Sequence, residues 1–554
     1  MIKKINFLVL ATIFMTFLLS TTVGANAQLP SGYLRVGLGS PTYYIESQSP
    51  SLEVLLSTGS SFLNMGSITG ASNFSITTDD DYYVFMHYVS PSDAADFNAF
   101  SRAIQLAAMA PRAVAALSWS GQWAVYAGPF TSEAEALAST GASVTAIRMP
   151  TGRRLALYSG WHRIVVFDND LFTPLFAGTI DPNTLIGMIN IDGHNYRGYL
   201  QAHRSGTNVT AVNVVHIEDY LLSVVPSEMP AGWPLHALKA QAIAARSYTH
   251  TQIGVHSERG YDLCSTVCCQ VYLGMRQESL NSTAAVNGTR GIVALHGGNI
   301  INAVYSSSSG GITDNSENVW TQTVPYLRSV PDIHDTTGRE WSRAFTRSEL
   351  TQLAAANDQN IGAVQSVHIE PSQTGRVHRL ILTGQTGQIT LEREAIRTFF
   401  SLSSGGSLYS RNFRIDSFNI TQGGAPLVQS GNIFVINRGV PELRALSGLR
   451  FLNGMGEPAA LTGGNVNVQV ADGRRVLNLQ GMGTAPTNPA LGIQISGGLS
   501  SSGDTITFVG RGWGHGVGMS QHGARGMAYV GYTFEQILNH YYTGITLGVR
   551  EDFR

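Results

Sequence analysis

An alanine-rich helical pattern near the middle of the chain constrains the fold more than any other feature. Pro234 stands where the first residue of a helix is expected, and Leu235, Leu238, Ala242 and Ala245 then recur on one face as far as about residue 250. The many alanines allow close packing against a neighbouring element, because alanine is often fully buried. The sequence therefore predicts a buried helix at the centre of a domain core.

Segments typical of β-strands lie on both sides of this helix. Residues 28–79 alternate apolar and polar side chains and break at Gly and Pro, which predicts a β-rich lead-in segment. Strands are also expected over residues 161–215, before a short helix over 217–224, and again over residues 413–500, where Gly-rich turns indicate a β-rich insertion or subdomain. The expected fold class is α+β, multidomain and β-rich.

The N-terminus has the pattern of a secretory signal peptide. Lys3 and Lys4 precede an apolar run over residues 5–19, and small residues then end in an A-x-A sequence at Ala27. A retained membrane anchor is the alternative, because the run extended to Ala25 approaches the ~20 residues that span a bilayer. Both interpretations place the rest of the chain outside the cytoplasm, as a secreted or cell-wall-associated protein.

The charge composition of the chain limits the kind of molecule that it can be expected to bind. Charged residues make up 13% of the chain and the formal net charge is −2. This balance argues against a nucleic-acid partner held by a basic surface. It suits a polar, weakly charged polymer such as glycan, and we expect no organic cofactor.

Residues 80–151 contain two related units, each with an apolar strand, a turn and a helix that opens at Ser or Thr. In the second unit Ser132 and Glu135 provide a capping-type helix start. These units, with "VYAGPFTSEAEALA" at residues 125–138, resemble the SPOR domain, a small βαβ-duplicated module that binds peptide-stripped glycan strands in other bacteria. An ordinary α+β subdomain is the alternative.

Three motifs follow in order: "EDYLLSVVPSEMPAGWPLHALKAQAIAARSYT", "VYSSSSGGITDNSENVW" and "GRGWGHGVGMSQHGARGMA". Together they resemble the SpoIID/LytB family of stage II sporulation protein D and the amidase enhancers, over about residues 160–550. The resemblance implies a catalytic domain built from residues 160–412 and 501–554, with the alanine-rich helix at its centre.

The resemblance implies lytic cleavage of peptidoglycan between N-acetylmuramic acid (MurNAc) and N-acetylglucosamine (GlcNAc), on strands stripped of peptide, which leaves 1,6-anhydro-MurNAc ends. Glu228, in the "EMP" motif, takes the catalytic position. The amidase-enhancer branch implies an alternative, a non-catalytic wall-binding protein that stimulates an amidase or another cell-wall hydrolase.

A single acid suits a lytic transglycosylase. Hydrolytic glycosidases usually need two carboxylates, whereas here the muramoyl C6 hydroxyl is an intramolecular nucleophile and one group can serve as acid and then base. Burial beside an apolar helix would raise the pKa of Glu228, as the acid role requires. The alternative is a structural acid that caps the next helix or pairs with Lys239 or Arg246.

Arg246 matches a basic position of the family motif, which implies that it orients Glu228 or binds the muramoyl lactyl carboxylate; a charge on a solvated helix face is the alternative. The second motif offers Tyr305, Ser308 and Trp320 for sugar binding. It also holds Asp314 and Glu317, the candidates for a second carboxylate in a hydrolase.

The third motif is a glycine-dense loop that allows close backbone approach to a ligand. Within it His515, Ser520 and Gln521 supply hydrogen bonds for sugar hydroxyls or a developing negative charge.

All cysteines lie within six residues, and with His256 they give a plausible tetrahedral zinc set of Cys264, Cys268 and Cys269. Some members of the family hold zinc in the equivalent loop. Four protein ligands would make the zinc structural rather than catalytic. The alternative is a Cys264–Cys268 disulfide with one free thiol.

Overall fold

The computed structural model describes residues 29–42, 188–205, 207–416 and 505–553, with shorter segments between residues 44 and 178 and between 432 and 478. The predicted signal peptide at residues 1–27 lies outside the described residues. Among the helices that are described, none has both the length and the apolar character to cross a membrane. The choice between a cleaved signal and a retained anchor stays a prediction.

The chain forms two compact units. Residues 1–305 with 521–554 make the first unit, and residues 306–520 make the second. The chain leaves the first unit within the second sequence motif, at strand β20 (Tyr305–Ser306), and returns within the third, after strand β33 (Met519–Ser520). The predicted domain boundaries stay predictions.

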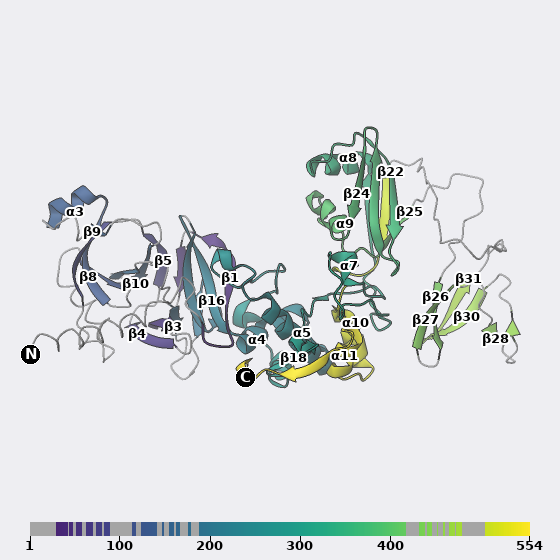
Figure 1. The fold of residues 1–554 in the computed structure, drawn as a ribbon, viewed down its shortest axis with the longest axis horizontal. Coiled ribbons are helices and arrows are strands. Elements are labelled where there is room, and N and C mark those ends of the chain that lie inside the picture. Colours follow the sequence, from purple (N-terminus) through teal and green to yellow (C-terminus); the bar gives the residue numbers. More distant parts are fainter. Residues whose placement is uncertain are drawn as a thin grey trace, which may run out of the picture. The chain divides into compact units, whose positions relative to one another are not determined.

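A seven-stranded sheet in the first unit has the order β17-β1-β16-β15-β12-β3-β4. Its strands are β1 (Tyr33–Thr42), β3 (Ser51–Ser57), β4 (Phe62–Thr69), β12 (Leu175–Gly178), β15 (Tyr199–Ser205), β16 (Asn208–His216) and β17 (Leu263–Cys264). Strand β1 pairs antiparallel with β16, with Tyr33 opposite His216. The lead-in segment therefore shares a sheet with the strand that precedes the "EMP" helix (Figure 1).

A second sheet in the same unit has the order β2-β5-β10-β11-β7-β8-β6-β9. Its strands are β2 (Tyr44–Ser47), β5 (Phe74–Asp79), β6 (Tyr82–Tyr88), β7 (Ala113–Leu117), β8 (Trp123–Phe130), β9 (Ile147–Arg148), β10 (Arg154–Ser159) and β11 (His162–Val166). The strand and helix of the second SPOR-like unit are confirmed as β8 and α3 (Glu133–Thr140), and Ser132 caps the helix by accepting from the Glu135 N–H. The helix expected within residues 89–112 lies outside the described residues.

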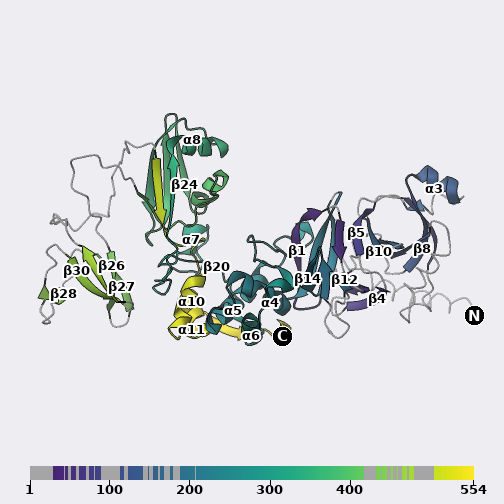
Figure 2. The same ribbon diagram turned by 180° about the vertical axis from the view of Figure 1, so that it is seen from behind.

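Helix α5 (Leu235–Gln252) is the centre of the helical part of the first unit (Figures 1 and 2). Its main neighbours are four helices and one strand. These elements are α4 (Ile217–Glu228), α6 (Leu280–Asn287), α10 (Gln521–Tyr529), α11 (Phe534–Tyr541) and β18 (Ile292–His296). Strand β18 pairs with β19 (Asn299–Ile300) and β34 (Thr546–Val549), and β13 (Met188–Ile191) forms a hairpin with β14 (His194–Arg197).

The burial of α5 is confirmed, because Leu238, Ala242 and Ala245 are fully buried. The helix begins one residue later than predicted: Pro234 is its N-cap, and Leu235 is 45% exposed. A helix of this composition gains its stability mainly from the neighbours that cover it.

Helix α4 differs more from the prediction, which ended it at Val224. It continues through Pro226 to Glu228. A proline inside a helix removes one hydrogen bond, which is why the sequence pattern suggests a stop. Here Val224 and Val225 are fully buried, and the Met229 N–H still donates to the carbonyl of Val225, so packing holds the last turn. Glu228 is therefore the last residue of a helix rather than part of a turn.

The second unit is built on two three-stranded sheets. Their strands are β21 (Trp341–Thr346), β32 (Thr505–Gly510) and β25 (Phe413–Asp416), then β22 (Val364–Pro371), β23 (Val377–Gly384) and β24 (Gln388–Glu392). The helices are α7 (Ser316–Val319), α8 (Arg347–Ala356) and α9 (Ala395–Thr398). Phe345, Phe400 and Phe508 meet in its buried core, with ring centroids 4.9–5.6 Å apart.

The described strands between residues 432 and 478 agree with the β-rich character expected for this segment. They pair two by two as hairpins. The pairs are β26 (Asn432–Asn437) with β27 (Val440–Ala445), β28 (Phe451–Leu452) with β29 (Pro458–Ala459), and β30 (Asn465–Val470) with β31 (Gly473–Asn478).

Candidate active site

Glu228 ends helix α4 with its carboxylate half-buried in the first unit. Its Oε1 accepts a hydrogen bond from the Val271 N–H at 3.0 Å, and its Oε2 accepts from Nε2 of Gln521 at 3.3 Å. These are its only hydrogen-bond partners among the described residues, and both are neutral. The alternative that Glu228 caps the next helix is wrong, because its two carboxylate oxygens accept from Val271 and Gln521, which lie outside α5.

Burial raises the pKa of Glu228 above its ordinary value. The hydrogen bonds from Val271 and Gln521 favour the carboxylate and act in the opposite direction, but they do not cancel the cost of desolvation. A carboxyl group without a cationic partner therefore keeps its proton to a higher pH than an exposed glutamate. This is the property that a general acid needs.

The raised pKa of Glu228 predicts a pH-dependent difference in stability between the wild type and Glu228→Gln. The folded state binds the proton more tightly than the unfolded state, so wild-type stability falls as pH rises from the ordinary glutamate pKa through the raised one. Glutamine has no such titration. Melting temperatures of both proteins are measured from about pH 4 to pH 8. The melting temperature of the variant should rise relative to that of the wild type as pH rises, and a difference that stays constant would contradict the raised pKa.

Gln521 was predicted to hydrogen-bond sugar hydroxyls or a developing charge. It is the first residue of α10 and is almost fully buried, with its amide directed to Glu228. The third sequence motif therefore reaches the catalytic candidate through Gln521. Its contact in this structure is with the carboxylate, which makes it a positioning residue.

A buried glutamine that the sequence analysis missed connects Tyr305 to this region. Gln270 precedes Val271 and is fully buried; its Oε1 accepts from the hydroxyls of Tyr220 and Thr249, and its Nε2 donates to the Tyr305 hydroxyl at 2.9 Å. Burial, and secondarily the charge of Glu228, raises the pKa of Tyr305 well above its usual value. Tyr305 therefore stays a phenol, able to donate a hydrogen bond.

Arg246 does not have either role predicted for it. It is fully buried, its Nε and Nη2 donate to the two carboxylate oxygens of Glu218 at 2.8 Å, and its Nη1 donates to the Ile292 carbonyl. Because its guanidinium is buried and hydrogen-bonded to Glu218 and Ile292, Arg246 contacts neither Glu228 nor a substrate. It also does not lie on a solvated helix face. Glu218 is the first residue of the first motif, two residues after the end of β16, and nothing in the sequence indicates that it pairs with Arg246.

In the second unit, two of the predicted sugar-binding residues are accessible and adjacent. Trp320 is 38% exposed, and its ring lies 5.2 Å from that of His515. The Nδ1 of His515 accepts a hydrogen bond from the Val517 N–H, which holds the imidazole within the glycine-dense loop. An exposed indole beside an imidazole is compatible with the predicted sugar-binding role.

Ser308 and Ser520 do not fit the sugar-binding role predicted for them. Both are fully buried. The hydroxyl of Ser308 donates to Asp335, and the hydroxyl of Ser520 accepts from the Ser309 N–H. These serines hold loop backbone and buried acids in place, and a sugar hydroxyl does not reach them in this arrangement.

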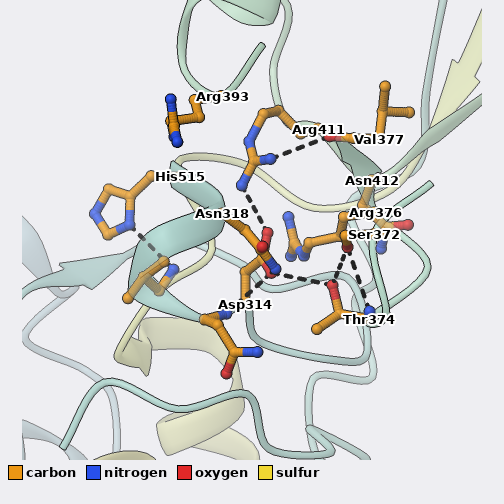
Figure 3. A network of polar contacts seen from close by, with 12 residues as sticks. Asp314, Asn318, Ser372, Thr374, Arg376, Val377, Arg393, Arg411, Asn412 and His515 are labelled. Atoms are coloured by element: carbon orange, nitrogen blue, oxygen red, sulfur yellow. Dashed lines mark hydrogen bonds and ion pairs between the residues drawn. The ribbon is translucent and has the colours of Figure 1, made fainter. Parts of the chain in front are cut away.

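Asp314 is not available as a second carboxylate, because it lies in a buried polar network of the second unit (Figure 3). Its carboxylate forms an ion pair with Arg411 at 2.6 Å, and both side chains are fully buried. Asn318 and Thr374 donate to its other oxygen. These contacts hold the Asp314 carboxylate in a structural role within its unit.

Glu317 also forms an ion pair with an arginine. Arg328 donates to both of its carboxylate oxygens, and this pairing lowers the pKa of Glu317 to about 2. A carboxylate that holds its proton so weakly is a poor general base at neutral pH. The prediction that Asp314 or Glu317 assists a hydrolytic reaction is therefore not supported by their contacts.

The predicted zinc ligands lie together in the first unit. One ligand atom from each of His256, Cys264, Cys268 and Cys269 lies within 4.8 Å of all the others, and the three cysteines are free thiols. Three thiolates and one imidazole at this spacing fit a tetrahedral zinc ion. Such a metal would hold the loop that continues directly to Val271, the backbone donor to Glu228.

We therefore expect protein purified without chelator to contain about one zinc ion per chain. Removing it should lower the melting temperature, because a metal that binds only the folded loop contributes its binding energy to folding. Elemental analysis combined with thermal melting before and after chelation checks this. A metal-free protein with a Cys264–Cys268 disulfide in its peptide map would contradict it.

A family model described as "Stage II sporulation protein" (SpoIID) matches residues 205–296. The chain therefore contains a SpoIID domain. The matched residues include Glu228, Val271 and all four predicted zinc ligands. The SPOR-like segment at residues 80–151 lies outside the match and stays a prediction.

Several proteins are similar to this SpoIID-domain chain over a wider range. It is 28% identical over 331 residues to the amidase enhancer of Bacillus subtilis (strain 168), which covers 59% of this chain and 40% of that protein. It is 25% identical over 360 residues to stage II sporulation protein D of the same organism, covering 62% and 77%. The stage II sporulation protein D of Bacillus amyloliquefaciens is 26% identical over 366 residues. The chain thus spans well under half the length of the amidase enhancer.

Proposed function

We propose that this protein is an exported lytic transglycosylase that cleaves the MurNAc–GlcNAc bond of peptide-stripped peptidoglycan strands and leaves 1,6-anhydro-MurNAc ends. The observation that carries the proposal is the state of Glu228. It is a half-buried acid with a raised pKa and two neutral hydrogen-bond donors, in the position of the family's "EMP" motif. Secreted or wall-associated localisation follows from this substrate.

The reaction uses one acid twice. Protonated Glu228 gives its proton to the glycosidic oxygen as the bond from that oxygen to C1 of MurNAc breaks. The resulting carboxylate takes the proton of the C6 hydroxyl while the C6 oxygen bonds to C1, so Glu228 is protonated again and no water is consumed. The hydrogen bonds from Val271 and Gln521 stabilise the transient carboxylate. Both donors are neutral groups that keep their own protons, so the carboxylate remains free to accept the proton of the C6 hydroxyl.

A hydrolase has less support. It would need a second carboxylate to activate water. Asp314 and Glu317, the two acids considered for that role, are each paired with an arginine.

The second candidate is a wall-binding protein that stimulates an amidase without cleaving glycan. The similarity to a protein named amidase enhancer favours it. In that case the partners are the glycan strands and the amidase, and the acid at Glu228 has a binding role only.

Mass analysis of products distinguishes the candidates. Wild-type protein is incubated with purified glycan strands with and without peptide stems, and the ends are identified. We expect 1,6-anhydro-MurNAc ends from the peptide-free strands. New reducing ends would indicate a hydrolase, and binding to the strands without new ends would favour the amidase enhancer.

A further inference from the structure

An arginine held between two aromatic rings lies on the helix that contacts Glu228. The guanidinium carbon of Arg525, in α10, is 5.2 Å from the ring centroid of Trp233 and 5.3 Å from that of Tyr529. The ring of His522 packs against the same indole at 5.0 Å. Trp233 belongs to the connection between α4 and α5, five residues after Glu228.

The position of Arg525 relative to Glu228 follows from the helix. Gln521, whose amide reaches Glu228, and Arg525 are four residues apart and so lie on one face of α10. At 1.5 Å per residue they are about 6 Å apart along the helix axis. A ligand that contacts Glu228 and extends along this face therefore meets Arg525 within one helical turn.

The contacts of Arg525 leave its charge without an anion. Among the described residues no carboxylate forms an ion pair with it, and its buried Nε makes no hydrogen bond. The side chain is nevertheless half-exposed, and Tyr529 beside it is 62% exposed. Stacking on two rings orders the guanidinium without using its terminal N–H groups, which can bind a carboxylate in the bidentate manner that arginine favours.

We propose that Arg525, Trp233 and Tyr529 form a subsite for a carboxylate-bearing sugar next to Glu228. In peptidoglycan that sugar is MurNAc, whose lactyl group is a free carboxylate only where the stem peptide has been removed. With the peptide attached the same group is a neutral amide. The subsite thus selects peptide-stripped strands by charge, and this assignment rests on the proposed glycan substrate.

Binding measured in a Glu228→Gln background tests the subsite without cleavage. Two probes are compared: peptide-free glycan strands, and the same strands with their lactyl carboxylates converted to methylamides. We expect the carboxylate strands to bind about tenfold more tightly, the effect of one charge-assisted contact. Adding Arg525→Gln should remove this preference, and Arg525→Lys should retain part of it, since lysine keeps the charge but not the planar fork.

Arg290→Gln is the matched control. Arg290 is exposed, and the next residue, Gly291, donates to Glu218 at the start of α4, whereas Glu228 ends that helix. This variant should keep the full preference. Equal binding of the two probes by the parent, or an unchanged preference in folded Arg525→Gln protein, would overturn the subsite.

Two further measurements keep the result interpretable. If Arg525→Gln does not fold, Tyr529→Ala replaces it, because Tyr529 is exposed and its loss should reduce the preference by loosening Arg525. Wild-type protein is also assayed for anhydro ends. Anhydro ends without a charge preference overturn the subsite alone, whereas a charge preference without anhydro ends overturns the transglycosylase and leaves the subsite in place.

Discussion

Glu228→Gln protein should release 1,6-anhydro-MurNAc ends about 10³-fold more slowly than the wild type, within the range that a positioned acid or base contributes. Glutamine keeps the size of the side chain, and its oxygen can still accept the hydrogen bond from Val271, but it can neither give nor take the proton. Binding of peptide-free strands should stay within a few-fold of the wild type, because Glu228 forms no ion pair with any residue that the structure describes. Product release is quantified by mass spectrometry and binding by sedimentation with the insoluble strands.

Glu535→Gln is the matched control for this substitution. Glu535 lies exposed in the first turn of α11, in the same unit, and its replacement should leave the rate unchanged. Release of anhydro ends by Glu228→Gln at the wild-type rate would exclude Glu228 as the acid and base. Loss of release together with loss of strand binding would instead support a binding role, as expected for an amidase enhancer.

Arg246→Met should lower the free energy of unfolding by about 3–5 kcal/mol, the effect of removing one member of a buried ion pair. Arg246 and Glu218 are both almost completely inaccessible, and the substitution leaves a buried carboxylate without its cation. The Ile292 carbonyl also loses a donor. Urea denaturation followed by circular dichroism measures the change.

Two controls show whether the effect comes from the unpaired charge. Adding Glu218→Leu should restore part of the stability, since an apolar pair removes the buried charge, although the Gly291 N–H then loses its acceptor. Arg550→Met breaks an exposed pair with Asp552 and should change the stability by less than about 1 kcal/mol. An Arg246→Met protein of wild-type stability with weakened glycan binding would restore the substrate-binding role that its burial argues against.

The sequence predicted the catalytic candidate but not its surroundings. Glu228 was found through its motif, whereas its partner Val271 contributes only a backbone N–H, which has no sequence signature. Gln521 was recognised as a polar donor, and its contact with a carboxylate 293 residues away appears only in the folded chain. Trp233 and Arg525 were missed although both lie within the quoted motifs, because nothing in their spacing indicates that they stack.

The errors share a cause. Residue type and motif position predict substrate-related roles for Arg246, Ser308 and Asp314, but each is fully buried with protein partners. Polar side chains in a loop or on a helix have the same pattern in the sequence whether they face a ligand or a buried counter-charge. Burial is a property of what packs over a residue, and that is decided elsewhere in the chain.

The sequence by itself determined the α+β class and the buried alanine-rich helix, because helix and strand periodicity are local properties of the chain. The role predicted for Glu228 came from the family resemblance carried by the three ordered motifs. Only the tertiary structure decided that Glu228 receives two neutral donors, that Arg246 pairs with Glu218, and that Arg525 has aromatic neighbours but no acid from the described part of the chain. Those outcomes depend on desolvation and on contacts between segments far apart in sequence, and neither exists until the chain has packed.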